Sequence, residues 1–124
     1  MKGKRTDLAG DACAIAQALG VVGDWWSLLI IRDAFRGRRR FGEFHQSIGL
    51  ARNILSSRLK KLVEHGVLRV DEGSGSERLY VLTPKGEALS GVLVALRAWG
   101  ETHCASEERS ATAGDASAER ATAA

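Results

Sequence analysis

The segment Ala51-Arg-Asn-Ile-Leu-Ser-Ser-Arg-Leu-Lys-Lys-Leu-Val-Glu-His65 predicts a helix with one apolar and one polar face. At about 100° of rotation per residue, the side chains of Leu59, Leu62 and Val63 fall within about 80° of Leu55. They form a stripe of the kind that packs against a core. The opposite side carries Asn53, Ser57, Lys60 and Glu64, with Ser56 and Lys61 on its flanks.

The polar face of this predicted helix has two interpretations. Amide, hydroxyl and cationic side chains hydrogen-bond base edges and phosphates when a helix lies in the major groove of DNA. An ordinary solvated helix shows the same pattern, because periodicity does not identify a ligand. The surrounding sequence therefore has to distinguish the two.

The charge of the chain is unevenly distributed. Between Arg36 and Arg69 there are nine basic and two acidic residues, a local charge of +7. Residues 105–124 carry four acidic residues and two arginines, a local charge of −2. The basic centre favours a polyanionic partner. A length of 124 residues with a single Pro predicts one compact domain with a modest core.

Nothing in the sequence predicts export or membrane insertion. Met1–Arg5 is basic, but no apolar segment follows it. The longest apolar run, Trp25 to Ile31, is too short to span a bilayer. We therefore expect a cytoplasmic protein without a membrane partner, in which Cys13 and Cys104 are reduced thiols.

The order of predicted elements is helix, helix, helix, helix, two-stranded hairpin, helix. Residues 1–10 are expected to be a flexible arm, 11–104 the folded domain, and the alanine-rich residues 105–124 a disordered tail. The predicted helices cover residues 11–19, 24–36 with a cap at Asp24, 41–48, 51–65, and 83 to about 103 with a cap at Thr83. The buried stripe of the second helix is predicted to be Trp26, Leu29, Ile30 and Ala34. The hairpin has predicted strands at 67–70 and 77–82 around a glycine-rich turn at 71–76.

This order is typical of a mainly α fold with a small β-hairpin, the winged helix-turn-helix. In that fold the last of three compact helices reads the major groove, and the hairpin, called the wing, reaches the DNA backbone or minor groove. Trp26, Phe41, Phe44 and Tyr80 are interpreted as core residues, since nothing in their spacing indicates a cofactor site.

The chain resembles the HxlR-type bacterial transcriptional regulators, within the broader MarR-like winged-helix group. The resemblance covers roughly residues 13 to 103 and rests on segments 13–19, 23–30, 40–44, 55–62, 65–68, 80–86 and 96–100. It implies a cytoplasmic, dimeric, DNA-binding regulator without catalytic activity. The chain departs from the family pattern at Trp25, where a cation is usual, at Ala51-Arg52, where a capping hydroxyl is common, in its short wing, and in its tail.

The resemblance favours DNA binding by the polar face of the 51–65 helix and by basic residues near it. Arg36, Arg38, Arg39 and Arg40 are predicted to position the protein on the DNA backbone. Arg78 is the candidate in the wing, and Arg58 is expected either to contact phosphate or to pair with an acid such as Glu43. The complete predicted DNA-binding set is Arg36, Arg38, Arg39, Arg40, Arg52, Asn53, Ser56, Ser57, Arg58, Lys60, Lys61 and Arg78.

The two terminal helices carry more apolar surface than a small winged-helix core can cover. An uncovered apolar stripe indicates an interface, and a symmetric dimer would cover it. Such a homodimer would offer two recognition helices to the half-sites of a pseudo-palindromic operator in double-stranded DNA, roughly 10 bp apart. The predicted interface residues are Ile15, Leu19, Leu93, Leu96 and Trp99.

Cys13 has two interpretations. Relatives in the resembling family use a cysteine at this position to sense electrophiles or oxidants, and a thiol at a helix start can have a lowered pKa. A lone cysteine can equally be an inert apolar filler. Apart from the adjacent His103-Cys104, the histidines and cysteines lack metal-ligand spacing, and no catalytic triad, HExxH motif or phosphate-binding glycine loop is present. No metal, cofactor or enzymatic activity is expected.

These features predict a homodimeric, sequence-specific transcriptional regulator, a repressor that responds to a chemical, small-molecule or redox signal. The alternative is a winged-helix protein-interaction module without specific DNA binding. Trp25, the uncapped Ala51 and the short wing favour that alternative.

Overall fold

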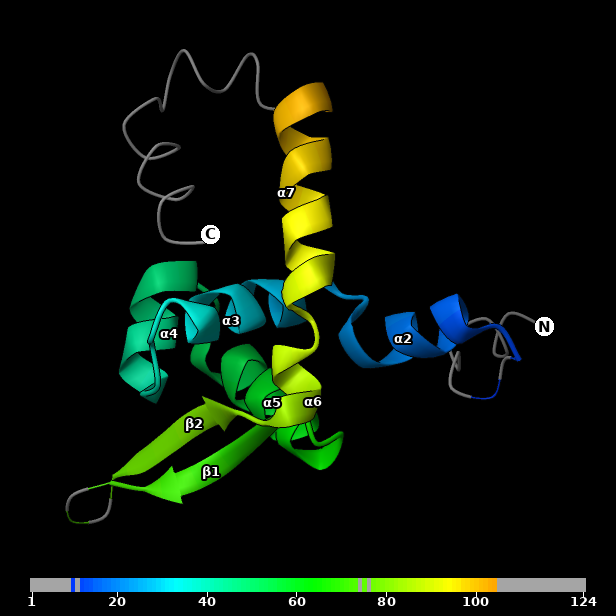
Figure 1. Ribbon diagram of the computed structural model, residues 1–124. Coiled ribbons are helices and arrows are strands. Elements are labelled where there is room, and N and C mark those ends of the chain that lie inside the picture. The colour runs from blue at the N-terminus through cyan, green and yellow to red at the C-terminus, as the bar shows by residue number, and fades with distance from the viewer. Residues whose placement is uncertain (1–9, 11, 74, 76, 105–124) are drawn as a thin grey trace.

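The computed structural model describes residues 10, 12–73, 75 and 77–104. The chain forms a group of helices with a two-stranded antiparallel hairpin projecting from one side, as Figure 1 shows. The predicted flexible arm, apart from Gly10, and the predicted disordered tail lie outside the described residues. The elements are α2 (Ala14–Val22), α3 (Trp25–Phe35), α4 (Phe41–Ile48), α5 (Arg52–Glu64), β1 (Leu68–Glu72), β2 (Arg78–Leu82), α6 (Pro84–Glu87) and α7 (Ser90–His103).

The first helix begins later than predicted. α2 starts at Ala14, because Cys13 has an extended backbone, and Gly20 lies inside the helix. Glycine inside a helix is tolerated at about 1 kcal/mol relative to alanine. The helix ends at Gly23, whose N–H donates to the Leu19 carbonyl over 2.7 Å. The helix therefore extends to Val22, three residues beyond the predicted end at residue 19.

The predicted cap of α3 is confirmed. Asp24 accepts a hydrogen bond from the Ser27 backbone N–H at 2.7 Å and a second from the Ser27 hydroxyl at 3.0 Å. The predicted buried stripe of this helix was only partly right. Ile30 is fully buried, but Trp26, Leu29 and Ala34 are half-buried. The fully buried positions are Ser27, Ile30, Ile31 and Asp33.

The core lies where α3, α4, α5 and the start of β1 meet. The stripe predicted on α5 is confirmed, since Leu55, Leu59 and Leu62 are inaccessible to solvent. Phe44 of α4 is buried with them, and its ring meets Tyr80 edge-on with centroids 6.5 Å apart. This packing fixes which face of α5 points outward. Gly66, with φ +77°, then turns the chain into the hairpin.

In the wing, residues 68–82, the first strand ends two residues later than predicted, and the second begins one residue later, at Arg78. Asp71 and Glu72, placed in the turn by sequence, extend β1 and pair with Leu79 and Arg78. Aspartate and glutamate are poor strand formers, so the ladder to β2 overrides local preference. The base of the wing is attached to the helical domain, because the Tyr80 N–H donates to the Arg39 carbonyl at 2.8 Å.

The predicted single C-terminal helix is two helices. Thr83 caps the short α6 as predicted, accepting from the Gly86 N–H at 3.1 Å. Its hydroxyl also donates to carbonyls at the end of the α5–β1 connection, and Lys85 donates to the His65 carbonyl at 2.7 Å. These bonds fix the direction of α6, and the chain turns at Leu89 before α7. α7 projects from the domain and has no fully buried residue (Figure 1).

No single helix among the described residues is long and apolar enough to cross a membrane. Together, α2 and α3 have the length and apolar composition of a membrane-spanning segment, but they are bent by 76° at their junction.

Candidate nucleic-acid interface

The polar face of α5, opposite the buried leucines, carries five exposed neutral or cationic side chains besides the exposed acidic Glu64. No hydrogen bond or ion pair connects any of the five to another residue in the described part of the chain. Two of them carry a positive charge, and three offer amide or hydroxyl groups that both donate and accept. The face is therefore free to bind an external polar partner. The five residues are Asn53, Ser56, Ser57, Lys60 and Lys61.

The N-terminus of α5 is electropositive. Ala51 at the N-cap provides no side-chain hydrogen bond, so amides of the first turn remain without a side-chain acceptor. Arg52 is exposed at the same end, with its guanidinium 5.6 Å from the centre of the Phe41 ring. A cation and the positive end of the helix dipole together favour a phosphate at this position.

A buried carboxylate organises the arginines at the end of α3. Asp33 is fully buried, and its Oδ1 lies 3.1 Å from Arg32, 3.8 Å from Arg36 and 4.0 Å from Arg38. The Arg36 side chain is only 12% exposed. Part of the positive charge counted in the sequence is therefore neutralised inside the protein. Asp33 was not predicted, although its spacing of three residues from Arg36 on one helix is a usable signal.

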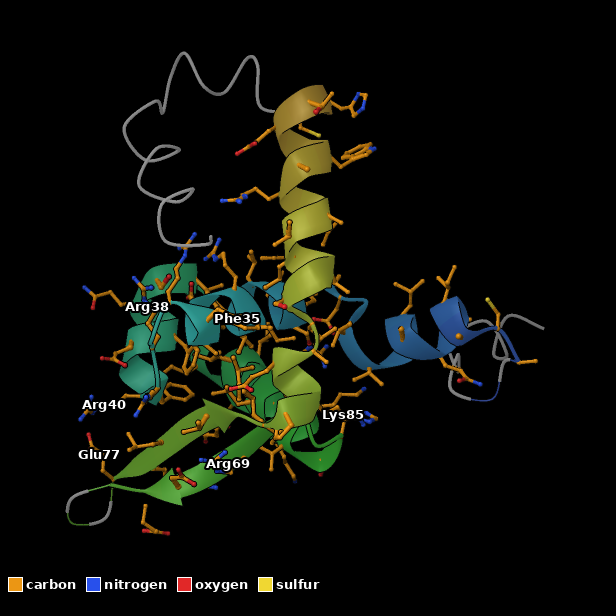
Figure 2. The ribbon with its side chains drawn as sticks, viewed as in Figure 1. Phe35, Arg38, Arg40, Arg69, Glu77 and Lys85 are labelled. Atoms are coloured by element: carbon orange, nitrogen blue, oxygen red, sulfur yellow. The ribbon has the colours of Figure 1, made fainter. Side chains whose placement is uncertain are left out.

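Two glutamates hold the turn before α4. Glu43 Oε1 accepts hydrogen bonds from the Arg39 and Arg40 amides at 2.8 and 3.1 Å, and these bonds lower the pKa of Glu43. Arg40 donates from Nε to Glu77 of the wing, and this contact raises the pKa of Arg40. Figure 2 shows the two side chains facing one another. Glu77 was missed because its partner is distant in sequence.

The remaining predicted DNA contacts lie in different settings. Arg58 points to the α3 side, where it lies 3.9 Å from Asp24 and 5.6 Å from the centre of the Trp26 ring. It pairs with an acid, but that acid is Asp24 and not Glu43. Arg39 is exposed, and Arg78 is exposed on β2 with its guanidinium over Tyr80. The structure thus places Arg52 beside Phe41 at the start of α4 and sets Arg58 apart, beside Asp24.

The residues predicted to form a dimer interface are largely exposed in the single chain. Ile15 is 71% and Trp99 60% exposed, and Leu19 and Leu96 are exposed to a similar degree. Leu93 is half-buried against the core. Apolar side chains grouped on two projecting helices are typical of an interaction surface.

Cys13 is exposed at the N-cap of α2. Hydrogen bonds from the Ala16 and Ile15 amides lower the pKa of its thiol. Cys104, at the other end of the described chain, is also exposed, and neither cysteine forms a disulfide. Within the described residues, histidine, cysteine and acidic side chains form no group of three that could hold a metal ion.

Comparison with known proteins identifies relatives for most of the chain. The family description that matches is HxlR-like helix-turn-helix, over residues 21–108. The uncharacterised HTH-type transcriptional regulator Rv3095 of Mycobacterium tuberculosis is 45% identical over 92 residues, which make up 73% of this chain and 58% of Rv3095. The chain therefore spans less than two thirds of that relative. The HTH-type transcriptional regulator YodB of Bacillus subtilis is 31% identical over 90 residues, 70% of this chain and 80% of YodB.

Solved structures share the fold. PA1607, described as a candidate transcription factor, superposes with a TM-score of 0.75 at 54% identity, covering 77% of this chain and 68% of PA1607. The reduced form of YodB superposes with a TM-score of 0.64 at 29% identity, covering 74% of this chain and 94% of YodB. The winged helix-turn-helix prediction is confirmed by these neighbours.

Proposed function

Because the chain belongs to the HxlR-like helix-turn-helix family, a family of transcription regulators and not of enzymes, we propose that it binds specific DNA sequences as a homodimer and represses transcription. We assign the role of repressor because a dimer bound over a promoter would block access of the transcription machinery to it. The protein would act in the cytoplasm, where bacterial DNA is transcribed.

The free polar face of α5 is the observation that carries this proposal. Leu55, Leu59 and Leu62 hold the helix in the core, so its other side is presented outward as a rigid surface. Amide and hydroxyl groups there suit base edges in the major groove. Arg52, Lys60 and Lys61 suit phosphates on either side of it. The N-terminus of α5 adds a further positive potential.

A second set of contacts would come from the basic turn and the wing. Arg38, Arg39 and Arg40 precede α4 next to the base of the wing, to which the Tyr80–Arg39 hydrogen bond attaches them. Backbone contacts from this region would set the orientation of α5 on the duplex without reading sequence. Arg78 would extend the contacts along the DNA.

Dimerisation is proposed through α2 and α7. Their exposed apolar side chains need a cover, and a second copy offers the same surface in a two-fold arrangement. The two α5 helices would then meet half-sites roughly 10 bp apart, one turn of the duplex.

Removing two cations from the α5 surface tests DNA binding. The Arg52→Ala/Lys60→Ala double variant should bind a short duplex of mixed sequence more weakly than the original chain. The slope of log K against log salt concentration should fall in magnitude by about 2, since each lost phosphate contact removes about 0.9 released counterion. Fluorescence anisotropy over a salt series measures both quantities.

The matched control is Arg69→Ala, which removes an exposed cation that is already paired with Asp71 on β1. It should leave the salt slope unchanged. An unchanged salt slope in the Arg52→Ala/Lys60→Ala variant would contradict the proposal that these two side chains contact DNA phosphates. Absence of DNA binding by the original chain at every salt concentration would favour the protein-interaction module.

We further propose that Cys13 links DNA binding to an oxidant or electrophile. The exposed thiol and its two backbone hydrogen bonds support this role. YodB has been solved in a reduced and a diamide-treated form, at 29% and 28% identity to this chain. A lowered pKa increases the fraction of thiolate, the reactive form, at neutral pH.

The pH dependence of alkylation tests this. The rate of iodoacetamide labelling at Cys13, followed by mass spectrometry, should rise to its plateau with a midpoint below the ordinary thiol pKa of about 8.5. The direction follows from the lowered pKa, because thiolate then forms at lower pH. A Cys104→Ser variant should give the same profile at Cys13. A midpoint at or above the ordinary value would contradict activation of this thiol.

A further inference from the structure

An ion pair connects the wing to the turn before α4. Glu77, the residue before β2, accepts a hydrogen bond from Arg40 Nε through its Oε2. A second nitrogen of the same guanidinium, Nη1, lies 3.7 Å from Glu43 Oε2. Figure 2 shows Arg40 and Glu77 pointing toward one another. The single positive charge of Arg40 therefore faces two carboxylates.

The two carboxylates have different roles. Glu43 Oε1 accepts hydrogen bonds from the backbone amides of Arg39 and Arg40 at 2.8 and 3.1 Å, so Glu43 holds the turn whatever the Arg40 side chain does. Among the described residues, the Glu77 carboxylate makes no hydrogen bond other than the one to Arg40. Its contribution is therefore to cover the Nε side of that guanidinium.

The position of the wing does not depend on the Glu77 side chain. The Tyr80 N–H donates to the Arg39 carbonyl at 2.8 Å, and the Tyr80 ring packs edge-on against Phe44. The Gly73 N–H donates to the Glu77 backbone carbonyl at 2.8 Å, a bond that a side-chain substitution leaves in place. The Arg40 and Glu77 side chains are 52% and 34% exposed, and ion pairs this exposed add little to stability. The effect of Glu77 is therefore electrostatic.

The covered guanidinium lies next to the proposed DNA-binding surface. Phe41 follows Arg40 in the chain, and the Arg52 guanidinium at the start of α5 lies 5.6 Å from the centre of the Phe41 ring. A duplex that contacts Arg52 would therefore pass close to Arg40. With its Nε side open, Arg40 would add a phosphate contact there, because guanidinium groups bind phosphate oxygens well.

The wing itself carries a net negative charge. Residues 68–82 contain two basic and three acidic residues, which gives −1. Such a hairpin has no excess of cations with which to attract a polyanion. The charged residues are Arg69, Asp71, Glu72, Glu77 and Arg78.

We propose that Glu77 masks Arg40 from DNA, because its carboxylate occupies the guanidinium that would otherwise bind a backbone phosphate. This inference rests on the proposed function and refines it, since Arg40 then belongs to the wing in complexes with unrelated sequences. Carboxylate and phosphate oxygens accept the same hydrogen bonds from a guanidinium, so they compete for its Nε side. The mask lowers the part of the affinity that phosphate contacts give to all sequences. The polar face of α5 is left unchanged.

The Glu77→Gln variant tests the mask, because a neutral amide of the same size no longer competes with phosphate. Fluorescence anisotropy with a duplex of mixed sequence over a salt series measures the effect. The slope of log K against log salt concentration should rise in magnitude by about 0.9, the counterion release of one added phosphate contact. At about 0.15 M salt this corresponds to roughly fivefold tighter binding. The Arg40→Gln/Glu77→Gln variant should lose this gain.

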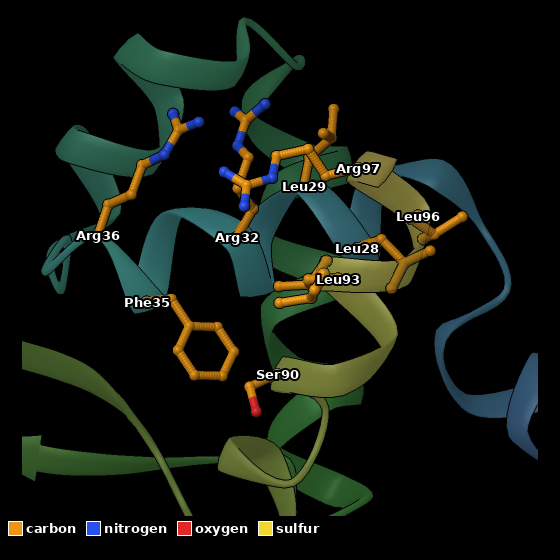
Figure 3. A pocket seen from close by; sticks show the side chains of 10 residues that line it. Leu28, Leu29, Arg32, Phe35, Arg36, Ser90, Leu93, Leu96 and Arg97 are labelled. Carbon is orange, nitrogen blue, oxygen red and sulfur yellow. The ribbon is translucent and has the colours of Figure 1, made fainter. Parts of the chain in front are cut away.

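The matched control is Glu72→Gln. It removes the same charge from an exposed position of the same wing, at a residue that pairs with no arginine of the turn in the described part of the chain. It should leave the salt slope unchanged. Neither glutamate lies on α2 or α7 or lines the cavity of about 520 Å³ between α3 and α7 (Figure 3). The molar mass in light scattering should therefore stay the same in every variant.

A heparin column, which carries a sulfated polyanion, provides a second readout that needs no DNA. Glu77→Gln should elute at higher salt than the original chain, and the Arg40→Gln/Glu77→Gln variant should not. This gain on heparin, without DNA binding by the original chain at any salt concentration, would contradict the proposed function and retain the mask.

Three results would overturn the mask. A gain that persists after Arg40 is also replaced, or an equal gain in Glu72→Gln, would assign the effect to the overall charge of the wing. Weaker binding by Glu77→Gln would make the ion pair a support that positions the wing on DNA. Equal binding of Glu77→Gln and the original chain to both polyanions would mean that Arg40 contributes nothing when uncovered.

Discussion

The Leu59→Ala variant is expected to lower the free energy of unfolding by about 2–5 kcal/mol. Leu59 is inaccessible to solvent at the centre of α5 and is surrounded by the core of α3, α4 and β1. Alanine removes three carbon atoms and leaves a cavity that a rigid core refills only in part. Small domains have a total stability of about 5–15 kcal/mol, so this one change would consume a large share of it.

Urea denaturation at one fixed protein concentration measures this loss, since the stability of a dimer depends on concentration. Lys61→Ala on the exposed side of the same helix is the control. It should change the unfolding free energy by no more than about 0.5 kcal/mol. A loss below about 1 kcal/mol for Leu59→Ala would mean that α5 is not anchored through this stripe. The polar face would then have no fixed orientation.

The elements that sequence predicts well are those whose signals are local. The helical period of Leu55, Leu59 and Leu62 predicts both α5 and its buried face. The caps at Asp24 and Thr83 follow from side chains that bond amides three residues later. The hairpin follows from alternating apolar residues around a glycine-rich turn.

The features that sequence does not predict depend on distant partners. The predicted C-terminal helix is interrupted after Glu87. Thr83 and Lys85 hydrogen-bond to the carbonyls of Gly66 and His65, and these distant partners cannot be recognised from a local pattern. The extension of β1 to Glu72 likewise depends on pairing of Asp71 and Glu72 with β2. Tertiary contacts override local preference in both cases.

The candidate interface shows the same division. Helical periodicity alone assigns Asn53, Ser57 and Lys60 to an exposed face, and the structure places them there. Counting charges overestimates the free cationic surface, because Asp33 and Glu77 pair with arginines of the turn. Arg58 was ambiguous in sequence because it lies at the edge of the packed face, and its partner Asp24 belongs to another helix.

Sequence specificity is the other large expected effect. DNA-binding regulators typically bind their operators 10³–10⁷ times more tightly than unrelated DNA at physiological salt. Here the exposed amide and hydroxyls of α5 would supply the discrimination, and the arginines and lysines would supply the salt-dependent affinity common to all sequences. Asn53→Ala should therefore relax the preferred sequence at one position in each half-site, while Lys61→Ala weakens all sequences alike.

Selection from a pool of random duplexes tests this most directly. The purified chain is incubated with the pool, and the recovered sequences are read after several rounds. A specific dimeric regulator should enrich a pseudo-palindromic motif whose half-sites are roughly 10 bp apart. Measured by fluorescence anisotropy, its affinity for this motif should be at least about 10³ times higher than for a scrambled duplex. Recovery of no motif, with equal affinity for all duplexes, would contradict reading of sequence by α5.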